Sequence, residues 1–314
     1  MKTQAILEKM ILVVLNISLW QGRKALKMSD LASNGIDVDK LPPGTLATLG
    51  SKRIISPDAV KVFKTLKRNA KNLCMKNGVR FAGDGYAVPR EKVEELSIAL
   101  MQLKGEFEVA KVHFMTVYAE EIEKWISSNQ PEWAPIIRAA VDSPSHIQKA
   151  ISFNYSALDV KAPEEIEENG LHEEINSLYG QLCHEVRLAA RRTFEQSFVG
   201  KTEITHKTLR PIMFIREKLA GLLFLEPSIA ETIQIIDDTL KKLPEIGPIK
   251  GTDLNMVGGL VGRQLANLGR LVTVEQQVRE EEYDYDDDED LTTNPEEIII
   301  SQDTGEVAPI SYDF

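Results

Sequence analysis

Two His-Glu pairs are the first residues whose types could do metal chemistry. His172-Glu173 and His184-Glu185 both resemble the start of the H-E-x-x-H zinc-protease motif, which places two imidazoles on one helical face. Neither pair continues to a second histidine, and Leu188 stands four residues after His184. We therefore expect both histidines to be exposed helical residues, and we predict no metal site.

A glycine-containing stretch, GTLATLGSK (44–52), superficially resembles a phosphate-binding loop. The functional motif is G-x-x-x-x-G-K-[ST] between a strand and a helix, so that backbone N–H groups and the lysine surround the phosphates. Here the glycines are one residue too far apart, the lysine follows a serine, and two prolines precede the stretch. No serine stands in a G-x-S-x-G elbow, and neither cysteine belongs to a recognisable nucleophile motif. The sequence predicts no catalytic residue and no cofactor.

A group of basic residues in the second half of the chain could neutralise phosphates and so bind nucleic acid. The alternative is an ordinary solvated helix face, because Arg191 can pair with Glu195 one turn further on. This candidate basic ridge consists of Arg187, Arg191, Arg192, Lys201, Lys207 and Arg210.

An acidic run, VREEEYDYDDDED (278–290), lies near the C-terminus, and nine of its thirteen residues are acidic. Such charges repel one another too strongly to fold alone, so this segment is predicted to be disordered. Residues 275–314 carry fifteen acidic residues and one basic residue, a net charge of −14. Because the whole chain carries −11, the part that precedes position 275 carries +3.

Apolar residues return after the acidic run, in EEIIISQDTGEVAPISYDF (296–314). A charged spacer with a short apolar end is typical of a tethered docking peptide, which adds to a sheet edge or fills a groove. The alternatives are a solubilising tail without a partner and a tail that folds back over the basic body. The candidate partner-binding residues are Tyr283, Tyr285, Asp286, Asp287, Asp288, Ile298, Ile299, Ile300, Tyr312 and Phe314.

Composition limits the class of protein. A hydrophobic content of 43% over 314 residues is enough for a real core. Cys74 and Cys183 are far apart and neither lies in a C-x-x-C pair, which argues against a disulfide framework and fits a reducing cytoplasm. The apolar run at 11–20 is shorter than the roughly 20 residues of a membrane span, so it is predicted to be a buried strand with one covered face.

The region at 1–160 combines short strands with long helices. Ser56 is a predicted N-cap with Pro57 at the first helical position, and Asp84-Gly85 supplies the turn of a predicted hairpin. Beyond the strand at 11–20, the predicted elements are a helix to about 76, a hairpin at 78–89, a helix at 90–126, a punctuated helical stretch ending near 150 and a strand at 151–160.

The helix at 90–126 is the most regular element. Its apolar residues alternate steps of three and four, the a/d pattern of a coiled-coil-like helix. The apolar pattern shifts by one position near Glu121, and Tyr118, Ile122 and Trp125 continue it. The apolar positions before that shift are Val93, Leu96, Leu100, Leu103, Phe107, Ala110, Phe114 and Val117.

Helical periodicity dominates the second half, where four apolar stripes are separated by short loops. Ser228 and Glu231 form the sequence pattern of a capping box at the start of one of these helices. All strands are expected within the region at 1–160. The predicted fold is mostly α with a small β component (α+β): an α+β region at 1–160, a helical bundle at 161–274 and an acidic tail at 275–314.

Three stretches together resemble a bacterial and phage family, domain of unknown function 3150. They are LWQGRKAL (19–26), SPDAVKVFKTLKRNAKNL (56–73) and GVRFAGDGYAVP (78–89). The resemblance implies genes on mobile elements beside those for a MoxR-type AAA+ ATPase and a von Willebrand factor A protein. The chain also looks like the helical front half of cobaltochelatase subunits, but it lacks the D-x-S-x-S motif of their adhesion domain.

These observations favour a non-enzymatic, cytoplasmic adaptor or scaffold protein of a bacterial mobile element or phage. Its expected partners are the MoxR-type ATPase and the von Willebrand factor A protein, and no membrane contact is expected. The alternative is a nucleic-acid-binding accessory protein whose acidic tail competes for the basic ridge.

Overall fold

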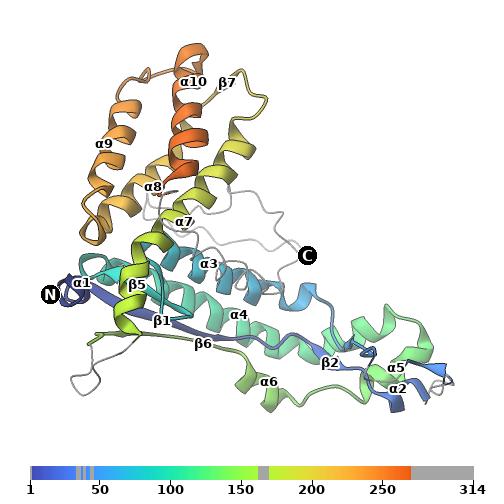
Figure 1. Ribbon diagram of the computed structural model, residues 1–314. Helices are drawn as coiled ribbons and strands as arrows, with labels where there is room; N and C mark the ends of the chain where they lie inside the picture. Colours follow the sequence, from blue (N-terminus) through green and yellow to red (C-terminus); the bar gives the residue numbers. More distant parts are fainter. Residues whose placement is uncertain (1, 33–36, 38–39, 43–45, 162–169, 270–314) are drawn as a thin grey trace. The chain divides into compact units, whose positions relative to one another are not determined.

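The computed structural model describes residues 2–32, 37, 40–42, 46–161 and 170–269. The chain divides into two units, Met1–Arg270 and Leu271–Phe314, and the described residues all belong to the first. This unit is mostly α with a small β component, as predicted (Figure 1). Its helices are α1 (Lys2–Leu7), α2 (Met28–Ala32), α3 (Lys61–Asn77), α4 (Val93–Ser127), α5 (Ala134–Arg138), α6 (Pro144–Ala150), α7 (Leu171–Ser197), α8 (Arg210–Gly221), α9 (Ile229–Leu240) and α10 (Gly251–Gly259).

Four strands form one antiparallel sheet in the order β4-β5-β1-β6, and two further pairs, β2-β3 and β7-β8, stand apart from it. The β7-β8 pair lies in the second half of the chain, so the expectation that all strands precede position 160 is wrong. Each of its strands is only two residues long, which is too short for a periodic signal. The strands are β1 (Met10–Ser18), β2 (Arg23–Ala25), β3 (Ser51–Arg53), β4 (Val79–Phe81), β5 (Gly85–Pro89), β6 (Ser152–Leu158), β7 (Glu203–Ile204) and β8 (Ile249–Lys250).

Strand β1 separates two hydrophobic cores. Ile11, Val13 and Ile17 belong to one core, whereas Met10 and, less completely buried, Leu12 belong to the other. Successive side chains of a strand point to opposite faces, so the alternation assigns each core to one face of the sheet. Both faces are therefore covered at the start of β1, and only one is covered at its end, where Asn16 and Ser18 are exposed.

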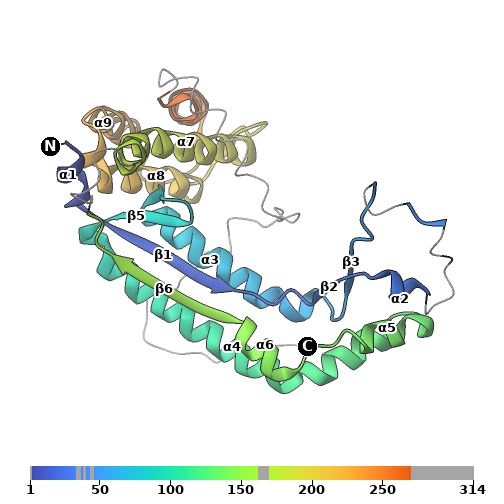
Figure 2. The same ribbon diagram turned by 60° about the horizontal axis from the view of Figure 1, so that its bottom comes forward.

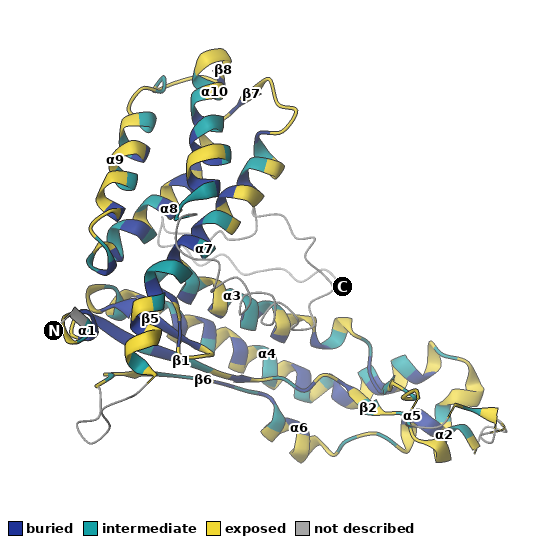
Figure 3. Ribbon diagram, viewed as in Figure 1, coloured by how far each residue is buried: buried dark blue, intermediate teal, exposed yellow. Residues whose placement is uncertain are grey.

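The first core lies between the sheet, α3 and α4, and Figure 2 shows α4 running along β6. The second core is built by α7, α8, α9, α10 and the segment after α10, and it includes side chains of α1 and β4. In Figure 3 the buried residues of α4 lie on the face of the helix that packs against α3 and the sheet. The buried positions of that helix are Leu96, Leu100, Leu103, Phe107, Phe114, Tyr118, Ile122 and Ile126.

Two local predictions are wrong. The hairpin turn uses Ala82 (φ 51°) and Gly83 (φ 76°) rather than Asp84-Gly85. Gly85 instead permits close packing, because an added Cβ would lie 2.5 Å from Leu12 Cδ1. Ser228 precedes α9 but makes no capping hydrogen bond there, and its hydroxyl lies 3.1 Å from the Tyr179 hydroxyl.

Candidate functional site

A buried ion pair joins α7 and α8. Lys218 Nζ lies 2.5 Å from Glu185 Oε2, and their side chains are only 11% and 5% exposed. Lys218 also donates to the carbonyl oxygen of Met75, at 2.5 Å. Glu185 Oε1 accepts from the backbone N–H of Arg80 at 3.2 Å and from Gln181 Nε2 at 3.2 Å. The pair therefore connects four elements, α3, β4, α7 and α8.

This junction has a structural consequence at the sheet edge. Arg80 lies on β4, the outermost strand on one side of the sheet, and its N–H would otherwise be an unpaired edge group. Glu185 satisfies that donor, and Lys218 neutralises the carboxylate in a site from which water is largely excluded. Buried charges persist when they are paired and hydrogen-bonded in this way. Glu185 of the second His-Glu pair thus forms a joint between α7 and α8.

A second polar network lies in the first half of the chain. Asp142 accepts from Trp20 Nε1 at 2.9 Å and from Lys24 Nζ at 2.6 Å, and its backbone carbonyl accepts from the Tyr118 hydroxyl at 2.9 Å. Burial alone would raise the pKa of Asp142, but the bonds from Lys24 and Trp20 outweigh it and hold the pKa below its usual value. The network fixes the segment between α5 and α6 against α4.

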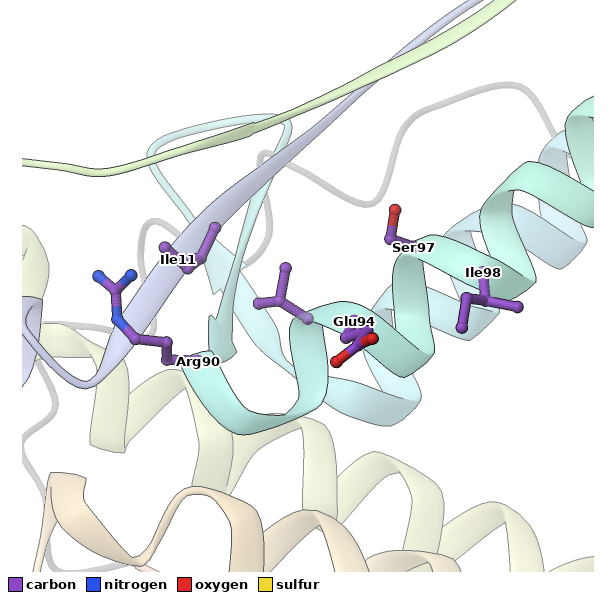
Figure 4. A pocket seen from close by; sticks show the side chains of 6 residues that line it. Ile11, Arg90, Glu94, Ser97 and Ile98 are labelled. Atoms are coloured by element: carbon purple, nitrogen blue, oxygen red, sulfur yellow. The ribbon is translucent and has the colours of Figure 1, made fainter.

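A shallow hollow of about 480 Å³ opens between β1 and the first turns of α4 (Figure 4). Arg90 at its rim is occupied, because its Nε donates to the carbonyl of Glu8 at 3.1 Å and its Nη2 pairs with Asp159 at 2.5 Å. Ser97 lies 3.0 Å from the Tyr155 hydroxyl. The remaining lining is the apolar set Ile11, Val93 and Ile98, together with the carboxylate of Glu94.

The hollow continues into an apolar face of α4 that points to solvent. We name Ile98, Met101, Gly105, Val109 and Val112 the outer stripe. Its four apolar side chains are 64%, 63%, 72% and 66% exposed in that order. A Cβ added to Gly105 would meet no atom within 4 Å. Exposed apolar residues that gather on one helix face indicate a surface for a protein partner.

The residues of the candidate basic ridge lie on consecutive elements of the second half. Arg191 and Arg192 are exposed on α7, Lys201 and Lys207 are exposed in the connection after α7, and Arg210 is the exposed first residue of α8. Arg187 is different, because its Nη1 donates to the carbonyl of Leu268 at 2.9 Å. That bond ties the end of the described chain to α7.

All the candidate partner-binding residues, from Tyr283 to Phe314, lie outside the described residues. Within the described ranges, no three His, Cys, Asp or Glu side chains are grouped as metal ligands would be. His172 Nδ1 lies 2.6 Å from the Thr3 hydroxyl. Over the same parts of the chain, every helix is either too short or too polar to cross a bilayer.

Neither the ion pair of Glu185 with Lys218 nor the outer stripe was predicted from the sequence. The sequence does contain a signal for the ion pair. Glu185 follows Leu182 by three residues, so it lies on the apolar face of the helix, where a charged residue needs a partner. The residues of the outer stripe recur at steps of three and four, as the buried residues of α4 do, so this spacing alone does not mark the stripe as exposed.

Comparison with known proteins places these features in a family. No curated protein and no solved structure matches the chain. One family model matches residues 7–265, from the end of α1 to Leu265 in the turn after α10, and so includes the first core, most of the second core and the ion pair between α7 and α8. The chain therefore belongs to the family described as protein of unknown function (DUF3150).

Proposed function

We propose that this chain is a non-enzymatic adaptor or scaffold protein of a mobile element or phage, acting with a MoxR-type AAA+ ATPase and a von Willebrand factor A protein. The observation that carries the proposal is the division of the chain after Arg270. The whole acidic run lies beyond that division, whereas both hydrophobic cores lie before it. The first unit, Met1–Arg270 (the folded unit), and residues 275–314 (the acidic segment) can therefore bind two different partners.

The charge distribution supports the proposal. Residues 275–314 carry −14, and the part of the chain before them carries +3. A concentrated negative charge steers association with a basic surface and makes that association sensitive to salt. After this electrostatic association, the apolar residues Ile298–Ile300 and Phe314 would supply the contacts that stabilise the complex. In this arrangement the folded unit holds one partner and the acidic segment binds the ATPase.

A pull-down with the ATPase and adhesion-domain proteins encoded beside this gene tests the proposal. We expect the full chain to retain the ATPase, and we expect the triple variant Asp286→Asn, Asp287→Asn, Asp288→Asn to retain much less. A matched control removes three exposed acidic groups from the folded unit, Glu195→Gln, Glu203→Gln and Glu217→Gln, and should bind as the wild type does. Equal binding by all three proteins would remove the acidic segment from the mechanism, and no binding by the wild type would reject the adaptor role.

The exposure of five of the six basic-ridge residues favours a second candidate, the nucleic-acid-binding accessory protein. In that case residues 275–314 compete with DNA for the ridge, so their removal should tighten salt-dependent DNA binding. Arg191→Ala with Arg192→Ala should reverse the gain. A truncated protein that is indifferent to DNA at low salt would reject this candidate.

A further inference from the structure

The outer stripe of α4 forms a continuous apolar line on a single helix face. Steps of three, four, four and three residues separate its five members. At 3.6 residues per turn, these steps keep every member within about 40° of the direction of Gly105. The buried face of α4, which includes Leu103 and Phe107, points the opposite way. The stripe extends over roughly 21 Å of helix, at about 1.5 Å per residue.

The stripe is symmetric about Gly105. Ile98 and Val112 each stand seven residues from it, and Met101 and Val109 each stand four residues from it. A second copy of α4 that runs antiparallel, with its own Gly105 opposite the first, would place Ile98 against Val112 and Met101 against Val109. A two-fold axis of this kind requires a self-complementary surface, and the spacing provides one.

The charges on one flank of the stripe fit the same arrangement. Lys104 and Glu108 lie one turn apart on the side of α4 that faces β6, where Lys104 Nζ donates to Asn154 Oδ1 at 3.0 Å. In the antiparallel pair, Glu108 of the second copy falls within about 3 Å of Lys104 along the axis, and the two-fold axis repeats this contact. On the opposite side, Glu95 falls equally close to His113 of the second copy, but Glu106 falls equally close to Glu106 of the second copy. The flank of Lys104 and Glu108 is therefore complementary, and the flank of Glu106 is not.

The absence of a side chain at Gly105 completes the match. Because a Cβ there would contact nothing in this copy, the glycine does not serve the packing of its own fold. A glycine in the middle of a long helix weakens that helix relative to alanine. At the two-fold axis, the missing side chain lets two backbones approach closely.

We propose that the outer stripe of α4 is the interface of an antiparallel homodimer centred on Gly105. This inference goes beyond the adaptor function and does not depend on it. A single helix face buries less than the roughly 1,000 Å² that is usual for a stable complex, so the dimer dissociates on dilution. A dimer would present two copies of every partner-binding segment, which raises the avidity for a multi-subunit partner.

Disulfide cross-linking of the full chain tests the register. The native Cys74 and Cys183 are buried, and burial raises the pKa of both thiols, that of Cys74 to about 12, so they do not compete. Mixing the single variants Ile98→Cys and Val112→Cys under a mild oxidant should give the mixed dimer, and each variant alone should give little. Cross-linking of each variant with itself would instead indicate parallel helices and would overturn the proposal.

Sedimentation equilibrium over a dilution series tests the surface itself. Val109→Glu should weaken the dimer by about tenfold or more, since it places a charge in an apolar contact on both copies. The control Val199→Glu changes a valine that is 58% exposed at the end of α7 and should leave association unchanged. Glu108→Lys and Lys104→Glu should each weaken the dimer, and their combination should restore it.

Gly105→Gln separates association from folding. It should raise the midpoint of thermal unfolding, because it removes a helix-weakening glycine, and it should weaken the dimer, because it fills the space at the two-fold axis. A full chain that remains monomeric at every concentration, or a dimer that is indifferent to both Val109→Glu and Gly105→Gln, would overturn the proposal.

Discussion

The two cores on either side of β1 differ in chemistry. In the first core, Phe107 contacts Phe63 and Phe153 edge to face, with ring centroids 5.1 and 5.4 Å apart. Trp20 and Tyr118 continue this aromatic chain at 5.7 Å. The second core is mainly aliphatic, with leucine, isoleucine and valine contributed by α7 and the helices that follow it. Aromatic edge-to-face contacts impose one geometry, whereas aliphatic groups tolerate several.

The difference suggests a division of roles within the folded unit. The aromatic core fixes the sheet against α3 and α4 and so makes a rigid platform. The aliphatic core packs on that platform through sheet residues such as Met10, Val79 and Phe81, and among the residues that the structure describes one buried ion pair, Glu185 with Lys218, adds a charged joint. Four sets of variants can break or sharpen this contrast, in order of decreasing effect on stability.

The largest effect is expected at the centre of the aromatic core. Phe107→Ala should lower the free energy of unfolding by about 4 kcal/mol, because rigid neighbouring rings leave the cavity open. Leu219→Ala in the aliphatic core, at a side chain that is also fully buried, should cost about 3 kcal/mol. Urea denaturation measures both values. A larger cost for the leucine variant would contradict the contrast between the two cores.

The next effect concerns the charged joint. Lys218→Met should cost about 3 kcal/mol, because it leaves the carboxylate of Glu185 buried without its counter-ion. Adding Glu185→Gln should recover most of that loss. Arg138→Met is the control, since its partner Glu123 is 56% exposed, and exposed pairs contribute about 0.5 kcal/mol. If the buried and the exposed pair cost the same, the joint does not contribute to the attachment of the second core.

Asp142 gives a smaller effect that depends on pH. Its folded pKa is lowered, so its stabilisation is present above the ordinary value of 3.8 and is lost as the pH falls through the folded pKa. Asp142→Asn should therefore cost about 1.5 kcal/mol at neutral pH, and wild type and variant should converge in acid. Unfolding curves over a pH series measure this difference. A constant difference down to the most acidic pH would show that the carboxylate charge is not involved.

Asp237 in the second half provides a comparison for Asp142. Hydrogen bonds from Arg216, at 3.0 and 2.8 Å, lower its pKa in the same direction. Its side chain is 29% exposed, against 12% for Asp142. Asp237→Asn should therefore show the same sign of pH dependence with a smaller amplitude.

The smallest effect is a gain. Gly105→Ala should raise the free energy of unfolding by up to about 1 kcal/mol, since the added Cβ meets open space on a helix. Gly85→Ala is the opposite case, because its Cβ would lie 2.9 Å from the carbonyl oxygen of Phe81 as well as against Leu12. Thermal unfolding should separate the two variants in sign. A loss of stability in Gly105→Ala at a dilution where the chain is monomeric would mean that the space beside Gly105 is filled within the folded chain itself.

Local periodicity was enough to predict the long elements. The helix expected at 90–126 is the 3-10 turn Arg90–Lys92 followed by α4, and the strands expected at 11–20 and 151–160 are β1 and β6. Helix α3 ends at Asn77, directly before Gly78, as expected. These elements carry their own signal because their apolar spacing repeats over several turns or pleats.

Features that depend on distant residues could not be predicted. The hairpin contains two X-Gly pairs, and only the packing of Leu12 decides that Gly85 is needed in the strand and not in the turn. The hydroxyl of Ser228 hydrogen-bonds to the hydroxyl of Tyr179, 49 positions earlier, instead of capping α9. The ion pair joins residues 33 positions apart. Spacing identified the buried face of α4, but it does not predict that the outer stripe is left exposed.

Amide hydrogen exchange of the full chain, alone and with the MoxR-type ATPase, tests the adaptor account most directly. The account predicts that the ATPase slows exchange within residues 278–314 and leaves the two cores, represented by Phe107 and Leu219, unchanged. Slowing confined to the cores, or no slowing anywhere when the ATPase is saturating, would contradict it.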